Sequence, residues 1–156
     1  METTDFSVGV VLEGDHSLAL AFTDHGILGS GARGLVYDAT TSTPASWAEL
    51  EAELDEVFHL TRDAALAGVP IVYLVSEPAI WGHAAPLQSA LATALLGGMR
   101  SAAVELARPG ICANAVAARF YEDADRIARS VAFLLEGDLT GQVLLCGDTH
   151  LGRPAA

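Results

Sequence analysis

VPIVYLVS, residues 69–76, is an uninterrupted apolar stretch rich in β-branched side chains. Such a run is typical of a strand that is buried on both faces in a parallel sheet. Amphipathic helical patterns lie on both sides of it, over residues 44–67 and residues 87–107. The first of these patterns opens with a capping box from Ser46 to Glu49, which predicts where that helix begins. Helix, strand and helix in this order predict a parallel sheet covered by helices.

The alternation continues toward both ends of the chain. Residues 110–117 and 140–148 are strand-like, and residues 122–137 between them have a helical pattern. Two short apolar runs, 6–12 and 17–22, are separated by the turn-like EGDH and predict a hairpin or two adjacent strands. The chain has 156 residues and is 51% apolar, so we expect a single α/β domain spanning residues 1–156.

The charge balance excludes several kinds of partner. Twenty acidic residues against eight basic ones give a formal net charge of −12. Nucleic acids and anionic membranes are bound through Lys and Arg, so neither is an expected partner. The sequence has no apolar run of about 18 residues and no basic-then-apolar leader, so we expect a soluble, cytoplasmic protein. Cys112 and Cys146 lie in apolar runs and are expected to be buried, reduced thiols.

Two segments of the second half resemble the short-chain dehydrogenase/reductase family. They are GGMRSAAVELARPGICANAVA (97–117) and IARSVAFLLEGDLTGQVLLCGD (127–148), which are similar to the long helix, sixth strand, last helix and last strand of that family. The resemblance extends from about residue 34 to residue 148. It implies a truncated Rossmann-like three-layer sandwich with a mainly parallel sheet.

The residues that would make such a protein an enzyme are missing. The family uses a Tyr-x-x-x-Lys pair on the long helix for proton transfer, but this chain contains no lysine. Counting back from Glu105 places Gln88 and Ala92 at the tyrosine and lysine positions. Counting forward from Ser76 places Ser89 and Thr93 there. Neither register restores the pair.

Other family positions also differ. Ser76 stands where the family has its catalytic serine, and Glu53 replaces an asparagine on the preceding helix. The family's Pro-Gly after Asn-Ala-Val-Ala is replaced by Ala118 and Arg119. Only 33 residues precede Gly34, whereas one strand–helix–strand unit takes about 30. The resemblance therefore implies an inactive homologue with no catalytic set and no cofactor site of its own.

What the resemblance retains is the assembly half, because family members pair through the helices that match 44–67 and 87–107. It implies a non-catalytic pseudo-subunit in a hetero-oligomer, such as a heterotetramer. Its partner would be a full-length, active, NAD(P)-dependent dehydrogenase acting on a hydroxyacyl-CoA or another secondary alcohol. The expected interface residues are Trp47, Leu54, Phe58, Leu91, Leu95, Met99 and Leu106. The acidic residues 49–56 would disfavour pairing between two copies of this chain.

Two other functions remain open from the sequence. One is a stand-alone homodimeric domain that binds a small ligand near Ser76, Trp81 and His83. The other is a nicotinamide-independent enzyme that uses Ser76 or Glu53, although no G-x-S-x-G motif is present.

The five histidines have no metal-ligand spacing, so no metal is expected. HGILGSG (25–31) precedes a strand rather than a helix, so its glycines indicate a turn and not a phosphate loop.

Overall fold

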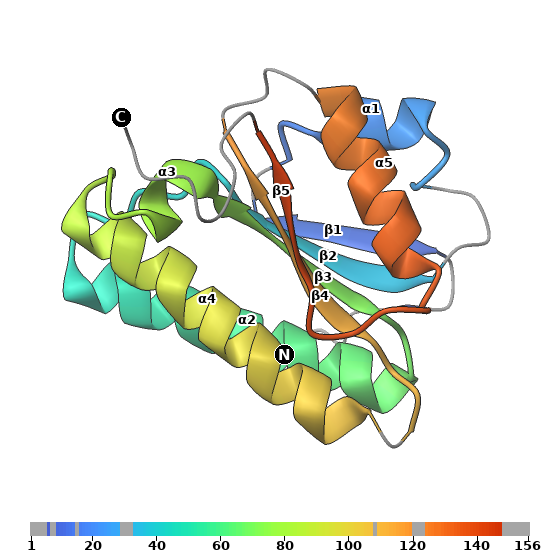
Figure 1. The fold of residues 1–156 in the computed structure, drawn as a ribbon. Helices are drawn as coiled ribbons and strands as arrows, with labels where there is room; N and C mark the ends of the chain where they lie inside the picture. Colours follow the sequence, from blue (N-terminus) through green and yellow to red (C-terminus); the bar gives the residue numbers. More distant parts are fainter. Residues whose placement is uncertain are drawn as a thin grey trace.

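A computed structural model describes residues 6, 9–14, 16–28, 33–107, 109–119 and 124–147. Its centre is a five-stranded, fully parallel sheet in which the strands lie in sequence order (Figure 1). The strands are β1 (Val10–Gly14), β2 (Gly34–Ala39), β3 (Ile71–Ser76), β4 (Ala113–Ala118) and β5 (Val143–Cys146). The predicted α/β class with a parallel sheet is confirmed.

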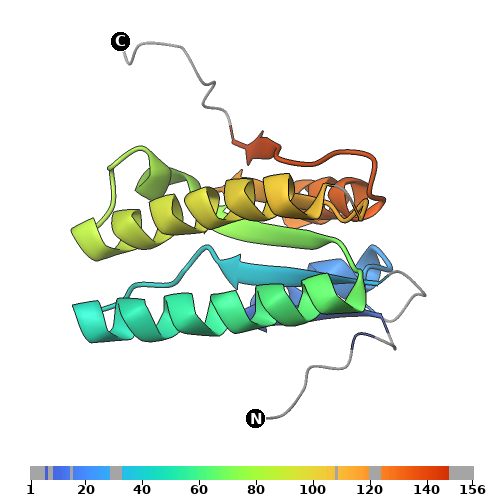
Figure 2. The ribbon, with the colours of Figure 1, turned by 90° about the horizontal axis from the view of Figure 1, so that it is seen from below.

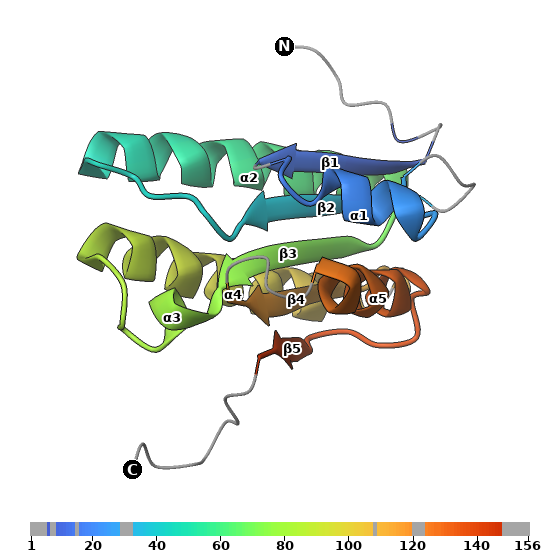
Figure 3. The same cartoon turned by 90° about the horizontal axis from the view of Figure 1, so that it is seen from above.

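Helices cover both faces of this sheet. They are α1 (Ala19–Asp24), α2 (Trp47–Ala67), α3 (Glu77–Ile80), α4 (Pro86–Leu106) and α5 (Ala124–Leu135). The long helices α2 and α4 lie side by side on one face (Figure 2). On the other face α1 and α5 are neighbours (Figure 3). The result is the expected three-layer sandwich, Rossmann-like in its architecture.

Each central strand contributes side chains to two separate cores, because neighbouring side chains of a strand point to opposite faces. On β3, Tyr73 and Val75 pack in the core beneath α2 and α4, whereas Val72 and Leu74 pack in the core beneath α1 and α5. Every residue of β2, β3 and β4 is buried. This burial on both faces explains why residues 69–76 are apolar without alternation.

The N-terminal prediction of a hairpin or two adjacent strands is wrong. Only β1 is a strand, and the second apolar run contains helix α1. Leu18 and Phe22 are both buried and lie four residues apart, so they point to the same face of a helical turn. The segment then returns to start β2 parallel to β1, with Val10 opposite Gly34. A hairpin would have made the two strands antiparallel.

The predicted capping box of α2 is present. Ser46 is the N-cap, and its hydroxyl accepts a hydrogen bond of 3.2 Å from the Glu49 amide. The Glu49 carboxylate in turn accepts one of 2.8 Å from the amide of Ala45. At the other end Gly68 closes the helix with a φ of 71°, a left-handed conformation that favours glycine. The long helix is therefore fixed at both ends by its own sequence.

Candidate functional site

Polar side chains gather at the carboxyl edge of the sheet. Asp38 is the second-last residue of β2 and Ser76 is the last residue of β3. Glu77 comes directly after β3, and Arg119 comes directly after β4. Ser76 is opposite Ala118 in the β3–β4 register, so these strand ends lie level with one another. In open α/β sheets, ligands bind outside this edge. It is therefore the first place to look for chemistry.

The β1–β2 part of the edge is occupied by the protein itself. Asp38 is buried, and its Oδ1 accepts hydrogen bonds from the Thr40 amide (2.9 Å) and the Thr40 hydroxyl (2.6 Å). Gly14, at the end of β1, approaches Asp38 so closely that a Cβ on it would lie 2.3 Å from the Asp38 carbonyl oxygen. Backbone contact rather than a cleft therefore fills this position.

Ser76 is buried and lacks the partners of an activated nucleophile. It is the N-cap of α3, but its hydroxyl makes no cap hydrogen bond. Within the described residues, no hydrogen bond joins this hydroxyl to a histidine or a carboxylate. His83 is exposed in the loop beyond α3. The geometry therefore assembles neither a Ser-His pair nor an oriented base.

The most constrained group at this edge is one that sequence reasoning missed. The Glu77 side chain is fully buried, and its Oε1 accepts a hydrogen bond of 3.4 Å from the Trp81 indole. Its Oε2 has no hydrogen-bond partner but lies 3.7 Å from Nε of Arg119. A Cβ on Gly147 would lie 2.3 Å from that same oxygen. The carboxylate therefore links the ends of β3, β4 and β5. The only sequence signal was an acid directly after a buried strand.

Glu53, which replaces the family asparagine, is engaged in a local network. Its carboxylate accepts hydrogen bonds from the Tyr37 hydroxyl (3.3 Å) and the Ser42 hydroxyl (2.6 Å). Burial raises the pKa of Tyr37 far above its ordinary value, and the charges of Glu53 and Glu56 raise it further. The pKa of Glu56 is also raised, by burial and then by Glu13 and Glu53. Glu53 therefore holds α2 against β2.

The four residues of α4 that align with the family's Tyr-x-x-x-Lys pair in the two registers do not form a proton-transfer pair. Ala92 is buried in the core, and Gln88 is half-buried. In the alternative register, Ser89 is half-buried and Thr93 is exposed. None of these four side chains is an acid or base suited to proton transfer near neutral pH.

The structure corrects part of the expected interface. Leu91, Leu95 and Met99 lie in the core between α4 and the sheet, so their apolar stripe faces inward and is not available to a partner. Leu54 and Leu106 are half-buried against the same core.

The side chains that do face outward on these two helices are different ones. Trp47 and Phe58 on α2 are 66% and 62% exposed. Trp47 therefore does not belong to the core, although its spacing places it on the apolar stripe of α2. Leu66 on α2 and Val104 on α4 are also large, apolar and exposed, and sequence reasoning did not select them. The exposed apolar groups of the α2–α4 layer are therefore these four.

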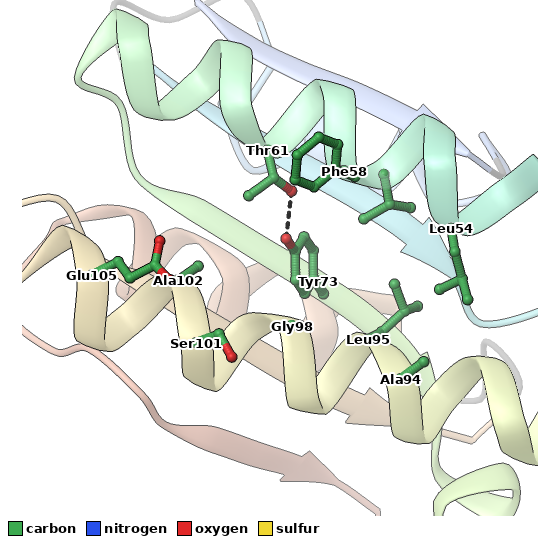
Figure 4. Close-up of a pocket in the computed structure, with 11 residues that line it drawn as sticks. Leu54, Phe58, Thr61, Tyr73, Ala94, Leu95, Gly98, Ser101, Ala102 and Glu105 are labelled. Atoms are coloured by element: carbon green, nitrogen blue, oxygen red, sulfur yellow. Dashed lines mark hydrogen bonds between the residues drawn. The ribbon is translucent and has the colours of Figure 1, made fainter. Parts of the chain in front are cut away.

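Between the two helices runs a groove of about 280 Å³ (Figure 4). Its floor is formed by Tyr73 of β3, whose hydroxyl is hydrogen-bonded to that of Thr61 on α2. Small residues of α4 form one wall, and Phe58 lies on the opposite side. The lining residues include Leu54, Val57, Phe58, Ala94, Gly98 and Ser101. The groove is largely apolar with a polar floor.

The described residues hold neither a candidate metal cluster nor a membrane-spanning helix. No group of three or more His, Cys, Asp or Glu side chains in them could hold a metal ion. None of the described helices is long and apolar enough to cross a membrane. Glycines 29 and 31 of HGILGSG lie outside the described residues; β2 does begin at Gly34, soon after that segment.

Comparison with known proteins defines the fold. No family model and no curated protein matches the chain. Among solved structures, the TT0495 protein from Thermus thermophilus is similar with a TM-score of 0.60 and 28% identity, over 85% of this chain and 74% of that one. The Cj0485 dehydrogenase is similar with a TM-score of 0.61 and 18% identity, over 84% of this chain and 69% of that one. The chain thus has a Rossmann-like fold related to that of a dehydrogenase.

Proposed function

We propose that this chain is a non-catalytic subunit of a hetero-oligomeric short-chain dehydrogenase, such as a heterotetramer. In this proposal it is a truncated, degenerate member of that family and stabilises or completes a full-length, active subunit. The observation that carries the proposal is the outward face of α2 and α4, where four large apolar side chains are exposed together on one helix layer. Large apolar side chains left exposed on one helix layer are a feature of many protein–protein contacts.

The carboxyl edge of the sheet also supports the proposal, because it lacks the groups that a catalytic site would need among the described residues. Its buried carboxylate, Glu77, is contacted by Trp81 and Arg119, and no base among the described residues is hydrogen-bonded to Ser76. In the described residues no strand lies beyond β1, where the family builds the adenosine half of its cofactor site. We therefore assign the NAD(P) and the catalysis to the partner subunit, with a hydroxyacyl-CoA or another secondary alcohol as substrate, in the cytoplasm.

The proposal is tested by co-expressing the chain with a complete dehydrogenase encoded beside it and measuring the assemblies by native mass spectrometry, with and without NAD. A mixed oligomer that holds nucleotide in proportion to the partner's copies is expected. A homodimer that ignores the dehydrogenase would contradict the proposal. Nucleotide bound to this chain alone would contradict its assignment as non-catalytic.

Matched variants locate the contact. Phe58→Glu with Val104→Glu places two charges on the exposed α2–α4 layer and is expected to abolish the mixed oligomer without unfolding the chain. Leu20→Glu makes the same chemical change at an exposed apolar position of α1, on the other side of the sheet. This control is expected to leave assembly intact. Substituting Leu91 or Leu95 instead would disrupt the core and say nothing about the interface.

The alternative of a small-ligand site near Ser76, Trp81 and His83 has less support. Ser76 is buried, the Trp81 indole is engaged with Glu77, and His83 is exposed. These side chains line neither the α2–α4 groove nor the pocket beside Ile27 and Leu135.

A further inference from the structure

Two adjacent glycines on α4 serve no purpose visible within the chain. A Cβ on Gly97 or on Gly98 would meet no atom within 4 Å. Glycine in a helix interior costs about 1 kcal/mol relative to alanine. Neither glycine is needed for a turn or a positive φ, since both lie inside a continuous helix. Their absent side chains do, however, leave the backbone of α4 accessible to an approaching element.

One of these glycines, Gly98, lines the groove between α2 and α4. Gly98 lines it together with Ala94 and Ser101, so the wall formed by α4 is low. Across the groove, Phe58 projects from α2 as an exposed aromatic ring (Figure 4). A recess next to a projecting aromatic group is the shape that lets a neighbouring helix pack closely.

The polar groups around the groove define which kind of side chain fits it. Glu105 lines it as an exposed carboxylate that has no ion pair with a described residue. The Thr61 and Tyr73 hydroxyls lie on its floor. A long cationic side chain could place its apolar stem against the walls and its charge beside the carboxylate.

The charge of the whole layer argues against a second copy of this chain as the occupant. Helix α2 carries six acidic side chains and one arginine, and α4 carries one arginine and one glutamate, which leaves a net charge of −5 on the two helices. In a two-fold dimer each copy would present this same acidic layer to the other. Like charges at a contact are unfavourable and disfavour the wrong partner. A basic surface would be attracted instead.

We propose that the α2–α4 groove docks a helix of the partner subunit whose facing surface is net basic, with a lysine or arginine side chain reaching Glu105. This inference rests on the proposed function, because it names the chemistry of the partner's contact. The acidity of α2 and α4 then selects the partner over a second copy of the chain. The open glycines of α4 allow that helix to approach.

The test compares variants of the chain in binding to any complete dehydrogenase encoded beside it, by native mass spectrometry and sedimentation. Glu105→Lys reverses the charge at the groove, and Gly98→Leu fills the recess at a position where an added Cβ meets no atom within 4 Å in the isolated chain. Each is expected to weaken binding about tenfold or more. Glu136→Lys, which makes the same charge change beyond α5 on the other side of the sheet, is expected to change it less than about twofold. Urea unfolding confirms that each variant is folded.

The outcomes separate this inference from the proposed function. A complex that forms but binds Glu105→Lys and Gly98→Leu as tightly as the unchanged chain overturns the groove inference and leaves the subunit proposal standing. A homodimer of the unchanged chain that Gly98→Leu disrupts also overturns it, because the occupant would then be a second copy. Absence of any complex with the dehydrogenase overturns both.

Discussion

Replacing Gly98 with alanine should stabilise the isolated chain. Gly98 lies inside the long helix α4, and the added methyl group would meet nothing within 4 Å, so no steric cost opposes the change. Alanine is favoured over glycine in a helix interior by about 1 kcal/mol, chiefly because it restricts the unfolded chain. For a domain of this size, that gain corresponds to an increase in Tm of about 2–4 °C.

The assay is urea unfolding followed by circular dichroism at low protein concentration. The midpoint is expected to rise with an unchanged slope, since the surface exposed on unfolding hardly changes. Gly34→Ala is the matched control, because a Cβ there would lie 2.6 Å from Leu135 Cδ2 and 3.1 Å from the Pro70 carbonyl oxygen. That substitution should destabilise the chain by about 1–3 kcal/mol. A neutral or destabilising Gly98→Ala would refute the reasoning, because it would mean that this side of α4 is already covered in the isolated chain.

Three further predictions concern the core, the Glu77–Arg119 contact and Tyr37. Leu95→Ala should lower the free energy of unfolding by about 2–5 kcal/mol because it opens a cavity in the core. Phe58→Ala, at an exposed position, should change it by less than about 1 kcal/mol. Urea titrations of the two variants measure both changes. Arg119→Met should cost about 1–3 kcal/mol because the carboxylate of Glu77 loses its cation, and the loss should shrink in a Glu77→Gln background, as a double-mutant cycle would measure. The raised pKa of Tyr37 predicts stability that is constant below about pH 10 and falls above it, where the unfolded phenol ionises and the folded one does not; Tyr37→Phe should flatten that decline in urea midpoints taken between pH 8 and 11.

The central part of the fold could be predicted from the sequence because its signals are local and redundant. The strand at 69–76 is apolar on both faces, and the helix before it carries its own N-cap and a closing glycine. The N-terminal segment could not be predicted in this way. Residues 17–22 are apolar at every second position as well as at helical spacing, and the choice depends on Leu18 and Phe22 meeting α5 in space. Tertiary contact, not local pattern, decided that element.

Three of the expected interface residues proved to be core residues for a related reason. A helix that lies on a sheet must bury its most apolar stripe there, and Leu91, Leu95 and Met99 form that stripe. A sequence shows that a stripe exists but not whether a sheet or another chain covers it. The informative residues were the ones outside the stripe, exposed Phe58 and the open Gly98, and their meaning is visible only once the position of the sheet is known.

The carboxyl edge of the sheet and the α2–α4 layer differ in how many of their polar and apolar groups already have contacts within the described residues. At the carboxyl edge of the sheet several polar groups contact one another: Thr40 donates to Asp38, and Trp81 and Arg119 approach the carboxylate of Glu77. A ligand that displaced these contacts would have to replace them. On the α2–α4 layer the opposite holds, since apolar side chains, an open groove and a surplus of acidic charge all lack their complement within the described residues. Burying apolar surface and pairing unpaired charge both favour association. These features are the basis on which we propose that the chain acts through the contacts of α2 and α4.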